Sequence, residues 1–377
     1  MIPNFSIVML GGSGAGKTIY LSCLYNKLKI LQLGSYYLFL ESNGQRENSL
    51  EKVFETLVSP SENWPDGTRS TQIWFFNCYL IVPGENRAYK ACKFSYIDYA
   101  GGTFIEGNNE RLKSQIASAD VLLCLLDGAK LLDFIEDKKT QDHDQFLYDL
   151  RKMLQEITQN DRHSLPVHFI ISKWDYIKEL SKFSLQDINK KLKSDIPEFD
   201  KFLQARDSPS TTRLIPISAL GRDFVDYRGS RRQRFINKIN KMIRKKINMT
   251  MSRKIEALNI EIPLAYILID VLQGSLDKYE NKQGIKLEEI TGFRKFILSL
   301  RSSAILIYLL NPLSEFLPNG FQWISVRILE EIFRKQSNDS YITNEKRKAL
   351  LKLVRQFKDD VQNFEISPEN KGSILKK

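Results

Sequence analysis

The feature that most constrains this chain is a glycine-rich loop near the N-terminus. Residues 11–18 read Gly11-Gly12-Ser13-Gly14-Ala15-Gly16-Lys17-Thr18, which fits the pattern G-x-x-x-x-G-K-[ST] at every fixed position. An apolar run over 5–10 precedes it, and residues 19–31 carry apolar side chains at helical spacing. A strand, a glycine loop and a helix N-terminus form an anion site, because backbone N–H groups and the helix dipole point at the ligand. The pattern therefore predicts a phosphate-binding P-loop rather than an accidental glycine-rich turn.

The polar groups of this loop have separate expected roles. Lys17 supplies a full positive charge for the terminal phosphates of a nucleotide, and the Thr18 hydroxyl can ligate Mg²⁺. We therefore expect Lys17 to be catalytic and Thr18 to be a metal ligand. The residues expected to contact the nucleotide here are Gly12, Ser13, Gly14, Ala15, Gly16, Lys17 and Thr18.

A second run, over 94–102, ends an apolar strand in an acidic residue. Asp98 stands at the strand tip, and Gly101 follows three residues later. A carboxylate in that place can hold Mg²⁺ beside the P-loop, usually through water. Gly101 has no side chain, so its N–H can approach a γ-phosphate closely. An ordinary strand end before a Gly-Gly turn is the alternative, and the P-loop upstream favours the functional interpretation.

Two further strand ends carry polar residues suited to a purine base. The apolar run 167–171 leads into Ser172-Lys173-Trp174-Asp175. The Asp175 carboxylate can accept two hydrogen bonds from guanine N1–H and N2–H₂, a donor pair that adenine lacks. The Lys173 stem can lie along the base, although a solvated surface pair is the alternative. The run 214–221 contains Ser218 and Ala219, and a backbone N–H near Ala219 could donate to guanine O6.

In this order, the four runs resemble the GTP-binding motifs of a P-loop GTPase of the translation-factor-related (TRAFAC) class. Three segments resemble the bacterial double-GTPase group more particularly: GGSGAGKTIYLSCLY at 11–25, NWPDGT at 63–68 and IDYAGG at 97–102. That group occurs in predicted conflict or defence gene clusters. The resemblance covers roughly residues 3–250. It implies a GTPase fold, GTP or GDP and Mg²⁺ as cofactors, and hydrolysis of GTP to GDP and phosphate.

The chain departs from the commonest GTPase pattern at two positions. Ser172 stands where most GTPases have Asn, and its shorter side chain implies a weaker link to the P-loop or base. Gly102 stands where Ras-like proteins have the glutamine that orients the attacking water, which implies slow intrinsic hydrolysis. The missing group could come from Glu106, from the C-terminal region or from a partner.

The resemblance also requires a switch threonine between the first helix and Asp98. Such a threonine reaches Mg²⁺ through its hydroxyl and the γ-phosphate through its N–H. Thr68 and Thr71 are the candidates. We favour Thr68, because Pro-Asp-Gly-Thr is typical of an exposed turn, whereas Thr71 suits the start of a strand.

Alternating strand and helix patterns predict an α/β fold. We expect a GTPase domain over 1–250, with a mostly parallel sheet and helices on both faces. An α-helical domain over 255–366 and a disordered basic tail over 367–377 follow. The expected strands are 5–10, 36–40, 72–82, 89–97, 120–127, 166–171 and 213–217. The expected C-terminal helices are 262–272, 287–310, 321–336 and 344–364.

The charge of the chain is unevenly distributed. The formal net charge is +11, yet residues 1–128 carry 11 basic and 12 acidic side chains. Residues 231–254 hold ten basic side chains and no acidic one, with apolar residues at helical spacing. This segment could be the last helix of the GTPase domain, packed on the sheet. It could also be a cationic amphipathic helix that contacts an acidic partner, either a membrane surface or nucleic acid.

The composition favours a cytoplasmic protein. Apolar residues make up 42% of the chain, yet no run approaches the roughly 18 uninterrupted apolar residues of a membrane span. The N-terminus opens directly into the first strand, so no signal peptide is expected. Four cysteines lack metal-ligand spacing and lie in apolar contexts, which predicts buried free thiols: Cys23, Cys78, Cys92 and Cys124.

Two classes of function remain open on the sequence. In the first, the chain is a GTPase switch whose helical C-terminal region senses the γ-phosphate and contacts a protein partner or a second copy. In the second, it is a non-hydrolysing GTP-binding module of a larger assembly. The intact P-loop, Asp98 and Asp175 favour the first, and Gly102 favours the second. A kinase is disfavoured, because the run 172–175 would then have no role.

Overall fold

The fold is seen in a computed structural model, which describes residues 4–28, 36–40, 47–59, 65, 71–81, 88–99, 110–160, 163–206, 212–221, 255–269, 358–370 and 372–375. Thr68, Gly101 and Gly102 lie outside the described residues, as does the basic segment 231–254. The expected helices 287–310 and 321–336 also lie outside them.

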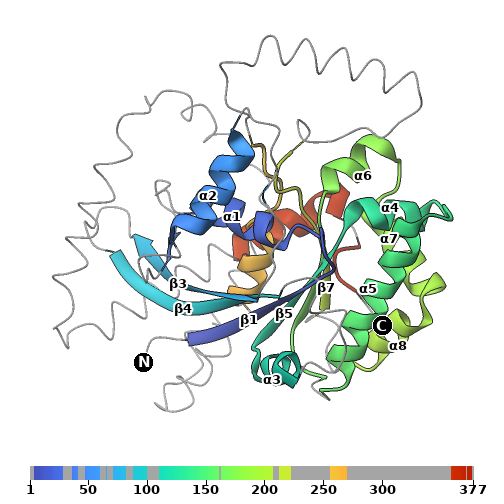
Figure 1. Cartoon of the computed structure of the whole chain (residues 1–377), viewed down its shortest axis with the longest axis horizontal. Coiled ribbons are helices and arrows are strands. Elements are labelled where there is room, and N and C mark those ends of the chain that lie inside the picture. Colours follow the sequence, from blue (N-terminus) through green and yellow to red (C-terminus); the bar gives the residue numbers. More distant parts are fainter. Residues whose placement is uncertain are drawn as a thin grey trace, which may run out of the picture.

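One mixed sheet forms the centre of the molecule (Figure 1). Its seven named strands have the order β2-β3-β4-β1-β5-β6-β7. Neighbours from β4 to β7 pair in parallel, whereas β2, β3 and β4 pair antiparallel. The expected mostly parallel α/β sheet is therefore confirmed. The strands are β1 (Asn4–Leu10), β2 (Tyr36–Leu40), β3 (Gln72–Ile81), β4 (Ala88–Asp98), β5 (Val121–Leu126), β6 (Val167–Ile171) and β7 (Thr212–Pro216).

The central strands are apolar on both faces because both faces are covered. Every residue of β5 is buried. Val121, Leu123 and Leu125 belong to one hydrophobic cluster, while Leu122 and Leu126 belong to the cluster on the other face. This alternation follows from the two-residue period of a strand. A continuous apolar run is the pattern expected of a parallel strand between two helical layers.

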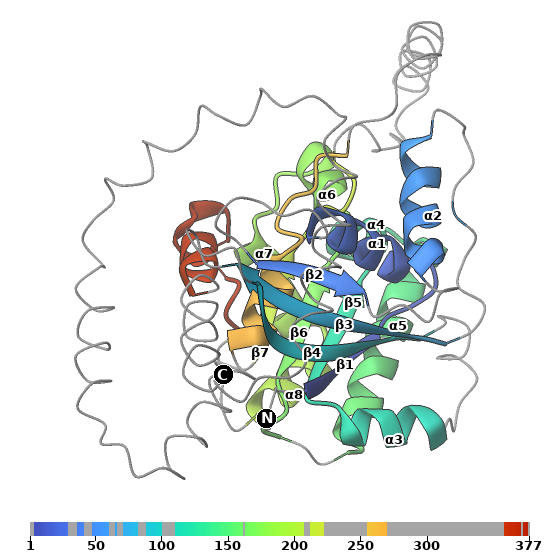
Figure 2. The same ribbon diagram turned by 90° about the vertical axis from the view of Figure 1, so that its left-hand side faces the viewer.

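Helices cover the two faces of the sheet in separate groups (Figures 1 and 2). On one side lie α1 (Lys17–Leu28) and α2 (Glu47–Val58), whose buried residues join the cluster of Ile7 and Met9. The other cluster takes its helical side chains from α3 (Glu110–Ser118), α4 (Gly128–Ile135), α5 (Gln141–Thr158), α6 (Trp174–Leu180), α7 (Leu185–Asp195) and α8 (Pro197–Gln204).

Helix α2 is not among the elements expected from the sequence, and it falls in a stretch rich in polar and charged residues, 42–70. Its buried residues Leu50 and Leu57 join the α1 side of the core. The Ser22 hydroxyl donates to the Leu50 carbonyl oxygen at 2.7 Å, which ties α2 to α1. The helical spacing of these apolar residues was missed because polar and charged residues surround them in the sequence.

All four cysteines are buried and free, as expected.

The C-terminal region contributes directly to this core. Helical residues 262–269 and 358–366 agree with two of the expected helices. Ile260, Tyr266 and Phe364 belong to the same hydrophobic cluster as α1. Within the described parts of the chain, no helix is long and apolar enough to cross a membrane.

The described residues of the expected disordered tail, 367–377, are ordered instead. Pro368–Asn370 form a 3-10 helix, η6. Further on, the Leu214 N–H donates to the Ser373 carbonyl at 2.7 Å, and the Leu375 N–H donates to the Thr212 carbonyl at 3.3 Å. Leu375 is 1% exposed and lies in the core. These residues are ordered because their backbone groups pair with the open edge of β7. The basic composition, which predicted disorder, does not reveal this pairing.

Candidate nucleotide site

The glycine-rich loop lies between β1 and α1, as predicted. Gly14 and Gly16 have φ angles of +80° and +89°, in the left-handed region that favours glycine. Helix α1 begins at Lys17, so the N-terminal end of its dipole points toward the loop. The seven residues expected to contact the nucleotide, 12–18, thus lie in this loop and at the first two positions of α1.

Lys17 is buried and curled over its own loop. Its ammonium donates to the Gly11 carbonyl at 2.8 Å and to the Gly12 carbonyl at 3.2 Å. Burial lowers the pKa of Lys17, while the nearby carboxylates of Asp98 and Asp149 act to raise it. The charge is thus held beside the loop backbone, where a phosphate group would be bound.

Thr18 and Asp98, predicted as ligands of one ion, are in direct contact. The Thr18 hydroxyl donates to Asp98 Oδ2 at 2.7 Å, although 80 residues separate the two. Strands β1 and β4 bring them together, because Met9 pairs with Asp98 in the parallel register. Asp98 is fully buried, and among the described residues its second oxygen, Oδ1, has no hydrogen-bond partner.

Burial raises the pKa of Asp98, and the neighbouring Lys17 charge and Thr18 hydroxyl act against that rise. A hydroxyl and a carboxylate supply hard oxygen ligands of the kind Mg²⁺ prefers. The described residues contain no group of three His, Cys, Asp or Glu side chains that could hold a metal alone. Proteins usually bind Mg²⁺ through one or two carboxylates together with substrate phosphates, so the pair suits that ion.

The base-side residues lie at the ends of β6 and β7. The Ser172 hydroxyl donates to the Leu126 carbonyl at 3.1 Å, so it supports the neighbouring strand end. Lys173 forms an ion pair with Asp127 at 2.7 Å. Asp175 lies in the first turn of α6, and burial raises the pKa of its carboxyl group. The Ser218 hydroxyl and nearby backbone N–H groups bond to the carboxylate and act against that rise.

Ser218 is held by three hydrogen bonds of its own. It exchanges two backbone hydrogen bonds with Leu258, at 3.0 and 2.8 Å, and its hydroxyl accepts from the Gly221 N–H at 3.0 Å. Ala219 follows it and is partly buried. The structure thus brings Asp175 and Ser218 together, and Ser218 links them to Leu258, which lies outside the predicted run 214–221.

Sequence reasoning missed a carboxylate beneath the P-loop. A Cβ added to Gly12 would overlap Asp149 Oδ2, so the carboxylate fills the space under the loop. Lys130 pairs with Asp149 at 3.5 Å, and the Gln145 amide donates to it at 2.8 Å. The sequence held one signal, since Asp149 interrupts the apolar face of α5 that includes Phe146.

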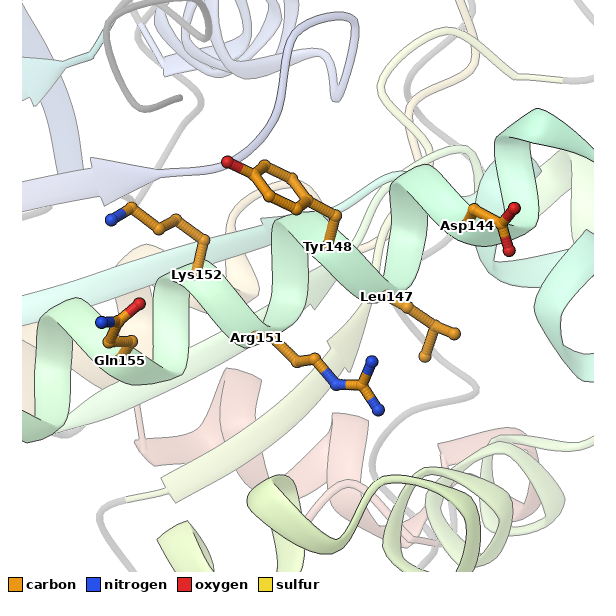
Figure 3. A pocket seen from close by; sticks show the side chains of 6 residues that line it. All are labelled: Asp144, Leu147, Tyr148, Arg151, Lys152 and Gln155. Carbon is orange, nitrogen blue, oxygen red and sulfur yellow. The ribbon is translucent and has the colours of Figure 1, made fainter. Parts of the chain in front are cut away.

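Helix α5 borders a small cavity and a larger surface hollow. A cavity of about 10 Å³, room for roughly one water molecule, is lined by residues that include Gly12, Asp127, Lys130 and Asp149. A larger surface hollow of about 310 Å³ runs along α5 (Figure 3) and contains none of the residues predicted to bind nucleotide. Its lining residues are Asp144, Leu147, Tyr148, Arg151, Lys152 and Gln155.

The two remaining site predictions, Thr68 and Gly101, lie outside the described residues. The rival switch candidate, Thr71, directly precedes β3 and is partly buried. Thr71 therefore lies at the start of a strand, as the sequence predicted.

Comparison with known proteins places the chain in a family. One similar solved structure is the signal recognition particle receptor SRb-GTP/SRX complex from Chaetomium thermophilum. It has 16% sequence identity and a TM-score of 0.34, and the match covers 63% of this chain and 98% of that one. The comparison with curated proteins gave no match. The family model of Double-GTPase 2 matches residues 6–220, which is more than half of the 377 residues. The chain therefore belongs to the Double-GTPase 2 family.

Proposed function

We propose that this chain is a guanine-nucleotide switch that binds GTP·Mg²⁺ and hydrolyses GTP slowly. A GTP-binding GTPase is the function that its family membership supports. One observation carries the finer proposal. A P-loop lysine, a hydroxyl–carboxylate pair and a partly buried base-side carboxylate all lie at the carboxyl ends of parallel strands in one sheet. Ligands of open α/β sheets bind at that edge.

At the phosphate end, Lys17 exchanges its bonds to loop carbonyls for bonds to the terminal phosphates. Thr18 and Asp98 hold Mg²⁺, and Thr68 is the proposed switch ligand. The ion supplies neutralisation of the charge on the β- and γ-phosphates. Support comes from the Thr18–Asp98 hydrogen bond at 2.7 Å and from Asp98 Oδ1, which has no hydrogen-bond partner among the described residues.

At the base end, Asp175 reads guanine through its two ring-edge donors. The carboxylate is partly desolvated, so a base without those donors would leave it unpaired. Such a mismatch is costly, because a site built for hydrogen bonds rejects ligands that lack them. Ser218 fixes the orientation of the carboxylate.

A titration of the purified full chain with GTP and ATP tests this proposal. GTP should bind at least tenfold more tightly than ATP, and Asp175→Asn should weaken GTP binding and improve binding of xanthosine triphosphate. Asp142→Asn, which removes an exposed carboxylate from the first turn of α5, is the control and should behave as the parent. Equal affinity of the parent for ATP and GTP would contradict the proposal.

Slow turnover is the second part of the proposal, and it rests on Gly102. A group supplied in trans can accelerate this class of reaction by about 10³–10⁵. We propose a protein partner or a second copy, bound through 255–366, as the source. Phosphate release per molecule should rise with protein concentration or on addition of a partner. Fast turnover at every concentration would contradict this part, and no turnover at all would favour the non-hydrolysing module.

A further inference from the structure

One buried carboxylate next to the base-side residues belongs to none of the motifs. Asp127 follows β5, begins α4 and is 7% exposed. Its Oδ1 accepts from the Ala129 N–H at 3.0 Å, which caps the helix. Its Oδ2 accepts from the Lys173 ammonium at 2.7 Å. The carboxylate therefore joins the start of α4 to the lysine expected to lie along the base.

The backbone around this pair is fixed on both sides. The Ser172 N–H donates to the Leu126 carbonyl at 3.0 Å. Gly128 packs so closely that an added Cβ would overlap the Ser172 carbonyl oxygen. Lys173 has a φ of +53°, a left-handed conformation uncommon for a residue with a side chain. The turn after β5 thus forms a rigid support for the turn after β6.

We propose that Asp127 is a specificity-determining positioning residue, which anchors the Lys173 ammonium so that the lysine stem forms an apolar floor for guanine. This inference rests on the proposed guanine site. A lysine stem has many rotamers, and ordering them when the base binds costs conformational entropy. The ion pair orders the stem in advance. Because side chains of this kind bury their methylene groups while the charged end stays bonded, the stem can face the base.

The sharpest variant is Asp127→Asn. Asparagine caps helices as well as aspartate does, so the bond from the Ala129 N–H is kept while the negative charge is lost. We expect GTP affinity to fall about tenfold and the preference for GTP over ATP to narrow. Affinity for inorganic triphosphate with Mg²⁺ and the melting temperature should stay at the parent values, because the P-loop and the cap are untouched.

A double-mutant cycle with Lys173→Met tests the coupling. Methionine keeps an apolar stem without the charge, so it should lower GTP affinity to a similar degree. The double variant should be no weaker than either single variant, because both remove the same ion pair. Asp133→Asn, at a partly buried carboxylate of α4 that accepts from the Thr140 hydroxyl, is the matched control and should bind GTP as the parent does.

The outcomes separate this inference from the proposed function. If the parent prefers GTP but Asp127→Asn binds GTP within twofold of the parent, the positioning role is wrong and the GTP site stands. If Asp127→Asn loses melting temperature and triphosphate affinity as well, Asp127 is only a structural cap and the inference is overturned. If the parent shows no preference for GTP, the proposed function itself fails.

Discussion

At the scale of single residues, the candidate site concentrates buried charge. Asp98 is fully buried, with one oxygen bonded to Thr18 and the other without a partner among the described residues. Burial raises its pKa, so the folded chain holds the Asp98 proton more tightly than the unfolded chain does. The stabilisation from this proton is complete below the ordinary pKa of aspartate and is lost as pH rises through the raised pKa of the folded state.

Asp98→Asn should therefore stabilise the nucleotide-free protein at neutral pH and weaken Mg²⁺-dependent GTP binding. The substitution keeps the shape of the side chain and removes the buried charge. We expect the melting temperature to rise by about 2–4 °C, the shift that 1 kcal/mol produces in a domain of this size. Thermal melts from pH 4 to pH 8 measure it, and the gain should grow with pH. A fall in melting temperature at neutral pH would show that the charge stabilises the fold.

Gly12 gives a second prediction at this scale. A Cβ on Gly12 would displace the Asp149 carboxylate, which is held by Lys130 and Gln145. Gly12→Ala should lower the free energy of unfolding by about 1–3 kcal/mol, as overpacking usually does. The double variant Gly12→Ala/Asp149→Ala should be less destabilised than the sum of the two single variants. Additive losses in urea denaturation would mean that the overlap is relieved elsewhere.

At the scale of elements, the strand edge at β7 is closed by the far end of the chain. Ser373 and Leu375 are buried, whereas Ile374 between them is 37% exposed, which is the alternation of a strand. Arg213 faces Ile374 in an antiparallel bridge. Pairing of this kind removes the unsatisfied backbone groups that an open edge would present.

Leu375→Ala should lower the free energy of unfolding by about 2 kcal/mol or more, because it leaves a cavity in the core. Ile374→Ala, on the exposed side of the same segment, is the matched control and should cost less than about 0.5 kcal/mol. Both values come from urea denaturation of the full chain. Equal losses for the two variants would mean that the segment does not dock as described.

At the scale of the whole molecule, the family-matched part of the chain does not hold a complete core. Residues 6–220 match the family, but Ile260, Leu264 and Phe364 share the hydrophobic cluster of α1. Tyr266 also packs against the sheet. Its ring lies 4.1 Å from the Arg213 guanidinium and 5.9 Å from the ring centroid of His168.

A chain shortened to residues 1–221 should therefore lose cooperative unfolding, since part of the sheet face that α1 and α2 cover would be left exposed. Near-ultraviolet circular dichroism and thermal melts measure this. A shortened chain with the parent melting temperature would show that the C-terminal segments are not part of the folding unit.

In the full chain, Tyr266→Ala should lower the free energy of unfolding by about 3–5 kcal/mol. Leu258→Ala should lower it much less, because the Leu258 side chain is 41% exposed.

The sequence by itself determined the fold class, the seven strands and the P-loop. These features depend on local patterns, such as the glycine spacing at 11–18 and the apolar runs that enter each strand. It also predicted Thr18 and Asp98 as ligands of one Mg²⁺ ion beside the P-loop. Tertiary structure alone revealed Asp149 under Gly12, the Asp127–Lys173 ion pair and the strand pairing of Leu375. Those contacts join residues tens to more than a hundred positions apart, and nothing in the local pattern of either partner specifies the other.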